Sequence, residues 1–182
     1  MVFTESSITL EFPDDNYFRI CECPAYKKMQ HIREMDFCWY NQNDNKLFLI
    51  ELKNWGNDSI DEEQDINIEQ EKINEIKEGI YKYRIRNLLE KSLDTLCIFS
   101  SILLGRPLGN RINNCAPFNI NTDTEIILLS IINWSSSDDS YISNINTAYR
   151  SKFNSYAKLF GVKSYYVLTK TLASDTFQWV KE

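Results

Sequence analysis

Three residues in the segment 31–55 have the types and the spacing needed to bind a divalent metal ion. Glu51 follows Asp36 after fourteen intervening residues, and Lys53 comes two positions later. Two carboxylates held close together repel each other unless a cation lies between them, and carboxylate oxygens suit a hard ion such as Mg²⁺ or Mn²⁺. A lysine beside such an ion can bind a phosphate group or orient an attacking water molecule.

A β-hairpin is expected to bring these residues together. Two runs rich in aromatic and aliphatic residues flank a polar turn at 41–46, which is the usual sequence pattern of a hairpin. If the turn is symmetric, paired residues have numbers that add to the same total as the two ends of the turn. This register places Asp36 opposite Glu51 and Glu34 opposite Lys53, with directly opposed Cβ atoms about 4.5–5.5 Å apart.

Because strand side chains alternate between faces, each strand of the hairpin should present two distinct faces. One face is expected to carry Glu34, Asp36, Cys38, Tyr40, Leu47, Leu49, Glu51, Lys53 and Trp55, and the other Met35, Phe37, Trp39, Phe48, Ile50, Leu52 and Asn54. The charged groups therefore share a largely apolar face. A half-buried carboxylate needs a partner, which favours a functional site over the alternative of ordinary solvated cross-strand pairs.

The pattern Asp36, then Glu51-Leu52-Lys53, resembles the PD-(D/E)XK motif of the restriction-endonuclease-like nuclease superfamily. Met35 stands where the nominal motif has proline. The resemblance implies that Asp36, Glu51 and the backbone carbonyl of Leu52 bind Mg²⁺ or Mn²⁺, and that Lys53 assists the hydrolytic water. It thereby implies metal-dependent hydrolysis of nucleic acid, most simply by a DNA endonuclease, with DNA favoured over RNA as the partner.

A third carboxylate ligand is left open by the same resemblance. The register favours Glu34, and Glu22 and Glu11 on preceding predicted strands are the alternatives. In this superfamily a helix at the start of the core often supplies a further glutamate, and no such helix is evident here.

The remaining patterns predict a single domain over 1–182 with an α/β (α+β) fold, in which helices flank a central mixed sheet. Strands are predicted at 7–12, 17–23, 124–134 and 163–170, with a last edge strand at 172–180; helices at 71–104, in two pieces, and 141–160; and a loop at 109–123. This order is similar to the αβββαβ core of the superfamily over residues 17–170. The acidic stretch 56–74 is interpreted as a solvated loop or first helical turn, with an acidic flap as the alternative.

Tyr81, Arg84 and Lys91 in the predicted helix 71–104 are candidates for contacts with a nucleic-acid backbone, since arginine and lysine bind phosphate. For each of them a solvated helix face is the alternative. An intrahelical pair between Lys91 and Asp94 is a further alternative, because these residues lie three positions apart near the apolar stripe.

Composition bounds the possible partners. The 182 residues carry a net charge of −6, which argues against tight autonomous binding of nucleic acid. A non-catalytic interaction module with a nuclease fold, working in a larger assembly such as a defence complex, is therefore the alternative function, and a protein partner or homo-oligomer is expected.

Neither a signal peptide nor an apolar run of membrane-spanning length is present, so a cytoplasmic location and no membrane partner are expected. The five cysteines are expected to be buried free thiols rather than a disulfide framework. With a single histidine, a structural zinc site is not expected.

Overall fold

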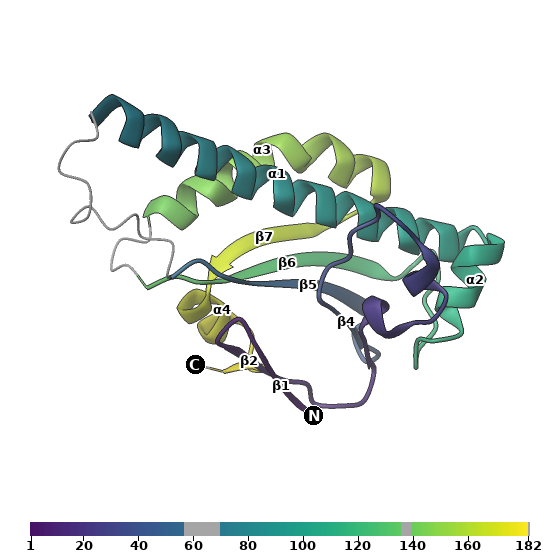
Figure 1. Ribbon diagram of the computed structural model, residues 1–182. Coiled ribbons are helices and arrows are strands. Elements are labelled where there is room, and N and C mark those ends of the chain that lie inside the picture. Colours follow the sequence, from purple (N-terminus) through teal and green to yellow (C-terminus); the bar gives the residue numbers. More distant parts are fainter. Residues whose placement is uncertain (57–69, 136–139, 182) are drawn as a thin grey trace.

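A five-stranded mixed sheet forms the centre of the protein (Figure 1). The computed structural model describes residues 1–56, 70–135 and 140–181. The strands lie in the order β3 (Tyr17–Phe18), β4 (Phe37–Asn41), β5 (Lys46–Asn54), β6 (Glu125–Asn133) and β7 (Ser164–Thr169). The strands from β3 to β5 pair antiparallel and those from β5 to β7 pair parallel, which confirms the predicted mixed sheet.

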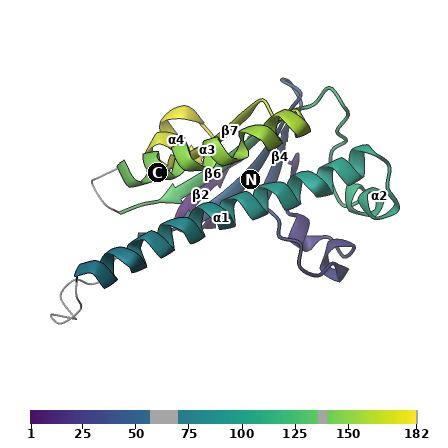
Figure 2. The same cartoon turned by 90° about the horizontal axis from the view of Figure 1, so that it is seen from above.

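Two long helices cover one face of this sheet, as both views show (Figures 1 and 2). They are α1 (Gln70–Leu103), which connects β5 with β6 together with the short helix α2 (Pro107–Asn113), and α3 (Ser140–Phe160), which connects β6 with β7. None of the helices in the described ranges is both long enough and apolar enough to cross a membrane.

The opposite face is covered by α4 (Lys170–Thr176) and by a small sheet (Figure 1). Its strands are β1 (Val2–Glu5), β2 (Ile8–Glu11) and β8 (Val180–Lys181). Because both faces are covered, β6 is apolar almost throughout and seven of its nine residues are buried. The sheet thus separates two hydrophobic cores.

The predicted hairpin register is confirmed where the strands pair. Phe37 lies opposite Ile50, and the ladder continues without a slip to the turn. The predicted faces of β5 are also confirmed, since Leu47, Leu49 and Trp55 join the core beneath the helices, whereas Phe48, Ile50 and Leu52 join the opposite core.

The first strand of the hairpin is shorter than predicted. β4 begins at Phe37, so Glu34 and Asp36 precede the ladder. The predicted cross-strand pair of Glu34 with Lys53 is therefore wrong, and Met35 packs in the helix-side core instead of beside Phe37. The physical reason is that the backbone amides of Arg33 and Met35 bond to side chains of α1 and not to β5.

Helical segments replace several predicted strands and a loop. The predicted loop 109–123 is wrong in its first part, which belongs to α2; this helix has Pro107 in its first turn, where the missing N–H costs nothing. Gly109 permits the close packing of α2, since a Cβ there would lie 2.3 Å from the Ser101 carbonyl oxygen of α1. α1 itself is continuous, not two pieces.

The predicted strands at both ends of the core are also largely wrong. Within 17–23 the strand ends at Phe18, and a 3₁₀ turn, η1 (Ile20–Glu22), follows; a second one is η2 (Tyr26–Lys28). Most of 172–180 is occupied by α4 and the turn after it, because the Thr169 hydroxyl accepts a hydrogen bond from the Leu172 amide and caps the helix. Residues 1–56 contain no α-helix, as expected. Most of the acidic stretch 56–74 lies outside the described residues.

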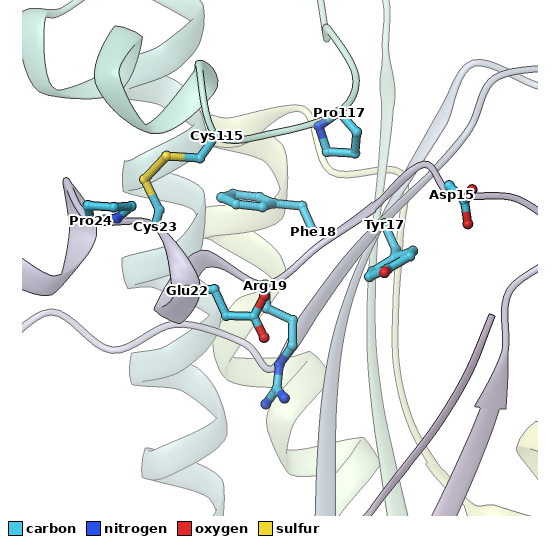
Figure 3. Close-up of a pocket in the computed structure, with 9 residues that line it drawn as sticks. All are labelled: Asp15, Tyr17, Phe18, Arg19, Glu22, Cys23, Pro24, Cys115 and Pro117. Atoms are coloured by element: carbon cyan, nitrogen blue, oxygen red, sulfur yellow. A yellow bond between two sulfur atoms is a disulfide. The ribbon is translucent and has the colours of Figure 1, made fainter.

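Cys23 and Cys115 form a disulfide, so the expectation of free thiols is wrong for this pair (Figure 3). The two residues are 92 positions apart in sequence, and the fold brings their Cα atoms to 5.8 Å by placing the exit of α2 beside η1. Of the other cysteines, Cys38 is buried, Cys21 is half-buried and Cys97 is exposed. The bond joins the N-terminal segment to the helical layer.

Candidate active site

Asp36 and Glu51 converge on one ammonium group, that of Lys91 from α1. The Lys91 Nζ lies 3.3 Å from Asp36 Oδ1, and 2.9 and 2.8 Å from the two carboxylate oxygens of Glu51. The Lys53 Nζ lies 2.5 Å from Glu51 Oε1. The two predicted carboxylates and the predicted lysine are thus brought together, between β5 and α1, with Lys91 as a fourth member.

The four side chains differ in their access to solvent. Glu51 is 1% exposed, whereas Asp36 is 15%, Lys91 18% and Lys53 27% exposed. Glu51 points toward α1 because it shares the face of β5 that carries Leu49 and the helix-side core. The site therefore opens on the side of Asp36 and the two lysines, and its floor is the carboxylate of Glu51.

Asp36 is held from two directions. Its Oδ2 accepts a 2.8 Å hydrogen bond from the backbone amide of Leu52, which lies next to Glu51 on β5. On the other side, the amide of Met35 donates to the Thr95 hydroxyl of α1 at 2.9 Å, and both Met35 and Thr95 are buried. The carboxylate is thereby fixed although it lies outside the strand.

The residues before Met35 are bound to the same helix. The Arg33 amide donates to Asp94 Oδ2 at 2.9 Å, and the Arg33 guanidinium forms a 2.9 Å ion pair with Glu90. Asp94 thus serves as an acceptor for the incoming chain, and the predicted intrahelical pair with Lys91 is wrong, because Lys91 reaches the sheet instead.

Burial and charge both act on the pKa values in this site. Burial raises the pKa of Glu51, and the nearby Asp36 raises it further, while Lys91 and Lys53 act in the opposite direction. For Lys91, burial lowers the pKa, but the two carboxylates together outweigh it and the net shift is upward. Lys91 is therefore a cation at neutral pH.

The donor atoms have the chemistry that a hard divalent cation requires. Glu51 Oε1 is buried, and both ammonium groups lie within ion-pair distance of it, at 2.5 Å for Lys53 and 2.8 Å for Lys91. A divalent metal ion would bind this oxygen in place of an ammonium group. The carbonyl of Leu52 faces the same strand edge as its amide, and hence Asp36. This carbonyl accepts a 3.4 Å hydrogen bond from the Ser6 hydroxyl. Among the residues that the structure describes, no group of three or more His, Cys, Asp or Glu side chains is placed to hold a metal ion. Proteins that bind Mg²⁺ commonly leave several of its ligand positions to water.

Among the alternatives for a third carboxylate, Glu34 interacts electrostatically with two residues of the site. Burial raises its pKa, and both Lys91 and Asp36 act on it electrostatically. Its carboxylate accepts a hydrogen bond from the Tyr26 hydroxyl and therefore already has a partner.

Glu22 and Glu11 lie elsewhere in the fold. Glu22 lines a pocket of about 330 Å³ beside Arg19 and the disulfide, and none of the four site residues lines that pocket (Figure 3). Glu11 on β2 forms a 3.1 Å ion pair with Lys181.

Tyr81 and Arg84 on α1 make their contacts with α3 and Trp55. The Arg84 side chain is buried, its guanidinium lies 4.5 Å from the centre of the Trp55 ring, and it donates to the Tyr141 hydroxyl at 2.9 Å. The Tyr81 hydroxyl donates to the Asn144 carbonyl of α3 at 3.1 Å. Binding of a nucleic-acid backbone by either residue would require these contacts to break.

Lys91 belongs to the carboxylate cluster, a place that the hairpin pattern does not predict for it. A signal was available, since Lys91 falls on the same helical stripe as Leu88 and Thr95, which are 1% and 0% exposed. A lysine at a buried helical position needs a counter-ion, and the nearest carboxylates belong to the hairpin.

Comparisons of the chain with models of protein families, with characterised proteins and with solved structures find no match. The interpretation of the site therefore depends on its own geometry.

Proposed function

We propose that this protein is a metal-dependent phosphodiesterase that hydrolyses nucleic acid, most simply a DNA endonuclease. The observation that carries the proposal is the convergence of Asp36, Glu51 and Lys53 at one end of the β4–β5 hairpin. A restriction-endonuclease-like core is part of the same proposal. It is supported by the order of the elements: the antiparallel strands β3 to β5, the helices α1 and α2, the parallel strand β6, the helix α3 and the parallel strand β7.

Asp36, Glu51 and the carbonyl of Leu52 would hold Mg²⁺ or Mn²⁺. When bound, such an ion lowers the pKa of a water molecule and offsets negative charge on a phosphate group.

Other groups of the protein would bind the phosphate, hold Asp36 in place and exclude water. Lys53 is the more exposed of the two lysines, so its ammonium can meet a phosphate at the opening of the site, orient the attacking water and stabilise the added negative charge. The amide of Leu52 keeps the Asp36 carboxylate in place, and the buried Glu51 closes the floor of the site to bulk water.

The proposal is tested by cleavage assays on plasmid DNA, single-stranded DNA and RNA with Mg²⁺ or Mn²⁺. Asp36→Ala and Lys53→Ala should each lower the cleavage rate by at least about a hundredfold, because each removes a group that acts on the reacting phosphate or the ion. Asp44→Ala in the hairpin turn, where the carboxylate accepts from Asn41, is the matched control and should retain full activity. Circular dichroism should show all three variants folded. Undiminished cleavage by Asp36→Ala protein would overturn the assignment.

A non-catalytic interaction module is the second candidate function, and one observation favours it. Two lysines already neutralise the two carboxylates, so the site is electrically balanced without a metal. Absence of cleavage of every substrate, together with absence of Mn²⁺ binding in calorimetric titration with and without nucleic acid, would favour the module.

A further inference from the structure

Lys91 stands between the two carboxylates that would hold a divalent metal ion. Its Nζ lies within 3.3 Å of one Asp36 oxygen and within 2.9 Å of both Glu51 oxygens, so a single cation already bridges the two side chains. Carboxylate oxygens that point at one ammonium nitrogen cannot at the same time close around a metal ion at about 2.0–2.1 Å. The two cations therefore compete for the same oxygens.

Charge balance points in the same direction. With both lysines in place, the two carboxylates are neutralised, and a divalent cation would leave a net charge of +2 around a glutamate that is 1% exposed. Like charges in a poorly solvated site repel strongly, since the local dielectric constant is far below that of water. The ion can enter at low cost only when an ammonium group leaves.

Lys91 is able to leave without any movement of the helix. Its neighbours on the buried side of α1, Leu88, Ser92 and Thr95, are each at most 1% exposed and hold the backbone in place. The lysine stem is flexible, and 18% of the side chain is already exposed at the opening of the site. Rotation of the stem would carry the ammonium toward solvent.

We infer that Lys91 is a built-in counter-ion that holds the carboxylate pair in the metal-free protein and opposes divalent-metal binding until its ammonium swings out. This inference rests on the proposed metal-dependent function and concerns the regulation of that same site. A device of this kind keeps Asp36 and Glu51 together before the metal arrives, and lowers the affinity for metal in return.

The first test is calorimetric titration of the whole protein with Mn²⁺, without nucleic acid, at one fixed pH. Lys91→Met keeps the apolar stem but removes the competing charge, so it should bind Mn²⁺ at least about tenfold more tightly than the wild type. Lys82→Met is the matched control, because Lys82 is exposed on the same helix and pairs with Glu78; its affinity should equal that of the wild type. Equal affinity of Lys91→Met and the wild type, or no Mn²⁺ binding by Lys91→Met, would overturn the inference.

A second test uses the unmodified protein and stays informative if Lys91→Met fails to fold. Acetylation by a water-soluble active ester, followed by peptide mass spectrometry, reports how accessible each lysine amine is. Saturating Mn²⁺ should raise the acetylation rate of Lys91 several-fold and leave that of Lys82 unchanged. A Lys91 rate that metal does not change overturns the inference.

The cleavage assay decides the proposed function separately. Cleavage by the wild type with no difference in Mn²⁺ affinity at Lys91→Met would retain the function and reject the counter-ion. Tighter Mn²⁺ binding by Lys91→Met with no cleavage of any substrate by the wild type would retain the counter-ion and reject the proposed function.

Discussion

The ion pair between Glu51 and Lys91 should contribute measurably to the stability of the protein, unlike the ion pairs on its surface. The perturbation is a double-mutant cycle with Glu51→Gln, Lys91→Met and the double variant. Glu51 is 1% exposed and Lys91 is 18% exposed, so each single change leaves a charge in a site that water hardly reaches. Glu51→Gln keeps side-chain length, and Lys91→Met keeps an unbranched stem that is one heavy atom shorter, which limits the change in packing.

The magnitude follows from the contacts that remain. Loss of one partner from a fully buried pair costs about 3–5 kcal/mol. Here each survivor keeps a second partner, since Glu51 retains Lys53 and Lys91 retains Asp36, so we expect about 2 kcal/mol for each single variant. The double variant should lose less than the two single losses combined, with a coupling energy of about 1–2 kcal/mol.

Urea unfolding at pH 7 measures these differences, because urea is uncharged and does not screen ion pairs as a salt does. Each single variant should also melt about 4–8 °C lower than the wild type. The exposed pair Glu78–Lys82, with side chains 63% and 70% exposed, is the matched control cycle and should give a much smaller coupling, because solvent screens exposed charges. A Glu51–Lys91 coupling no larger than that of the control would refute the view that the pair is a buried, stabilising contact.

Two further predictions concern the elements around the site. Thr95→Val removes the hydroxyl that accepts a hydrogen bond from the buried Met35 amide, so we expect the unfolding free energy to fall by about 1–3 kcal/mol and cleavage to slow. Thr147→Val, on the exposed side of α3, is the control and should change neither quantity. Full cleavage by Thr95→Val would show that this contact does not position Asp36. Gly109→Ala should lower the free energy of unfolding by about 2–3 kcal/mol, because its Cβ would lie 2.3 Å from a backbone oxygen of α1. Gly79→Ala, whose Cβ meets nothing within 4 Å, should raise the free energy of unfolding by about 0.5–1 kcal/mol. Thermal melts that rank the two alanine variants equally would contradict the close helix packing at Gly109.

Local patterns sufficed wherever the hydrophobic periodicity was strong. The alternation in 47–55 placed each β5 residue that belongs to a core on its correct side, and the symmetric turn predicted the register of β4 with β5. The apolar run at 124–134 predicted β6, and the amphipathic pattern at 141–160 predicted α3 within one residue at its start. In each of these segments the pattern of apolar and polar residues fits only one type of secondary structure.

Short elements at the margins of the core were predicted poorly. α2 and α4 have seven residues each, and their formation depends on close packing at Gly109 in one case and on a cap by Thr169 in the other. The first strand of the hairpin begins late, at Phe37, because the amides of Arg33 and Met35 bond to α1, a partner that is about 60 positions away in sequence. Local propensity carries no information about such partners.

The disulfide illustrates the same limit for covalent chemistry. Cys23 and Cys115 lie 92 positions apart, and no spacing pattern in the chain distinguishes them from the other three cysteines. Their pairing follows from the packing of α2 against the N-terminal segment.

The sequence by itself determined the mixed α/β class, the hairpin register and the side of the sheet on which Glu51 and Lys53 lie, because these depend on the residue periods of helices and strands and on the geometry of one turn. Only the tertiary structure decided which cation stands between Asp36 and Glu51. Lys91, 40 positions beyond Glu51 in sequence, reaches them from α1, and its charge matters because the packing of α1 against β5 removes water from that position.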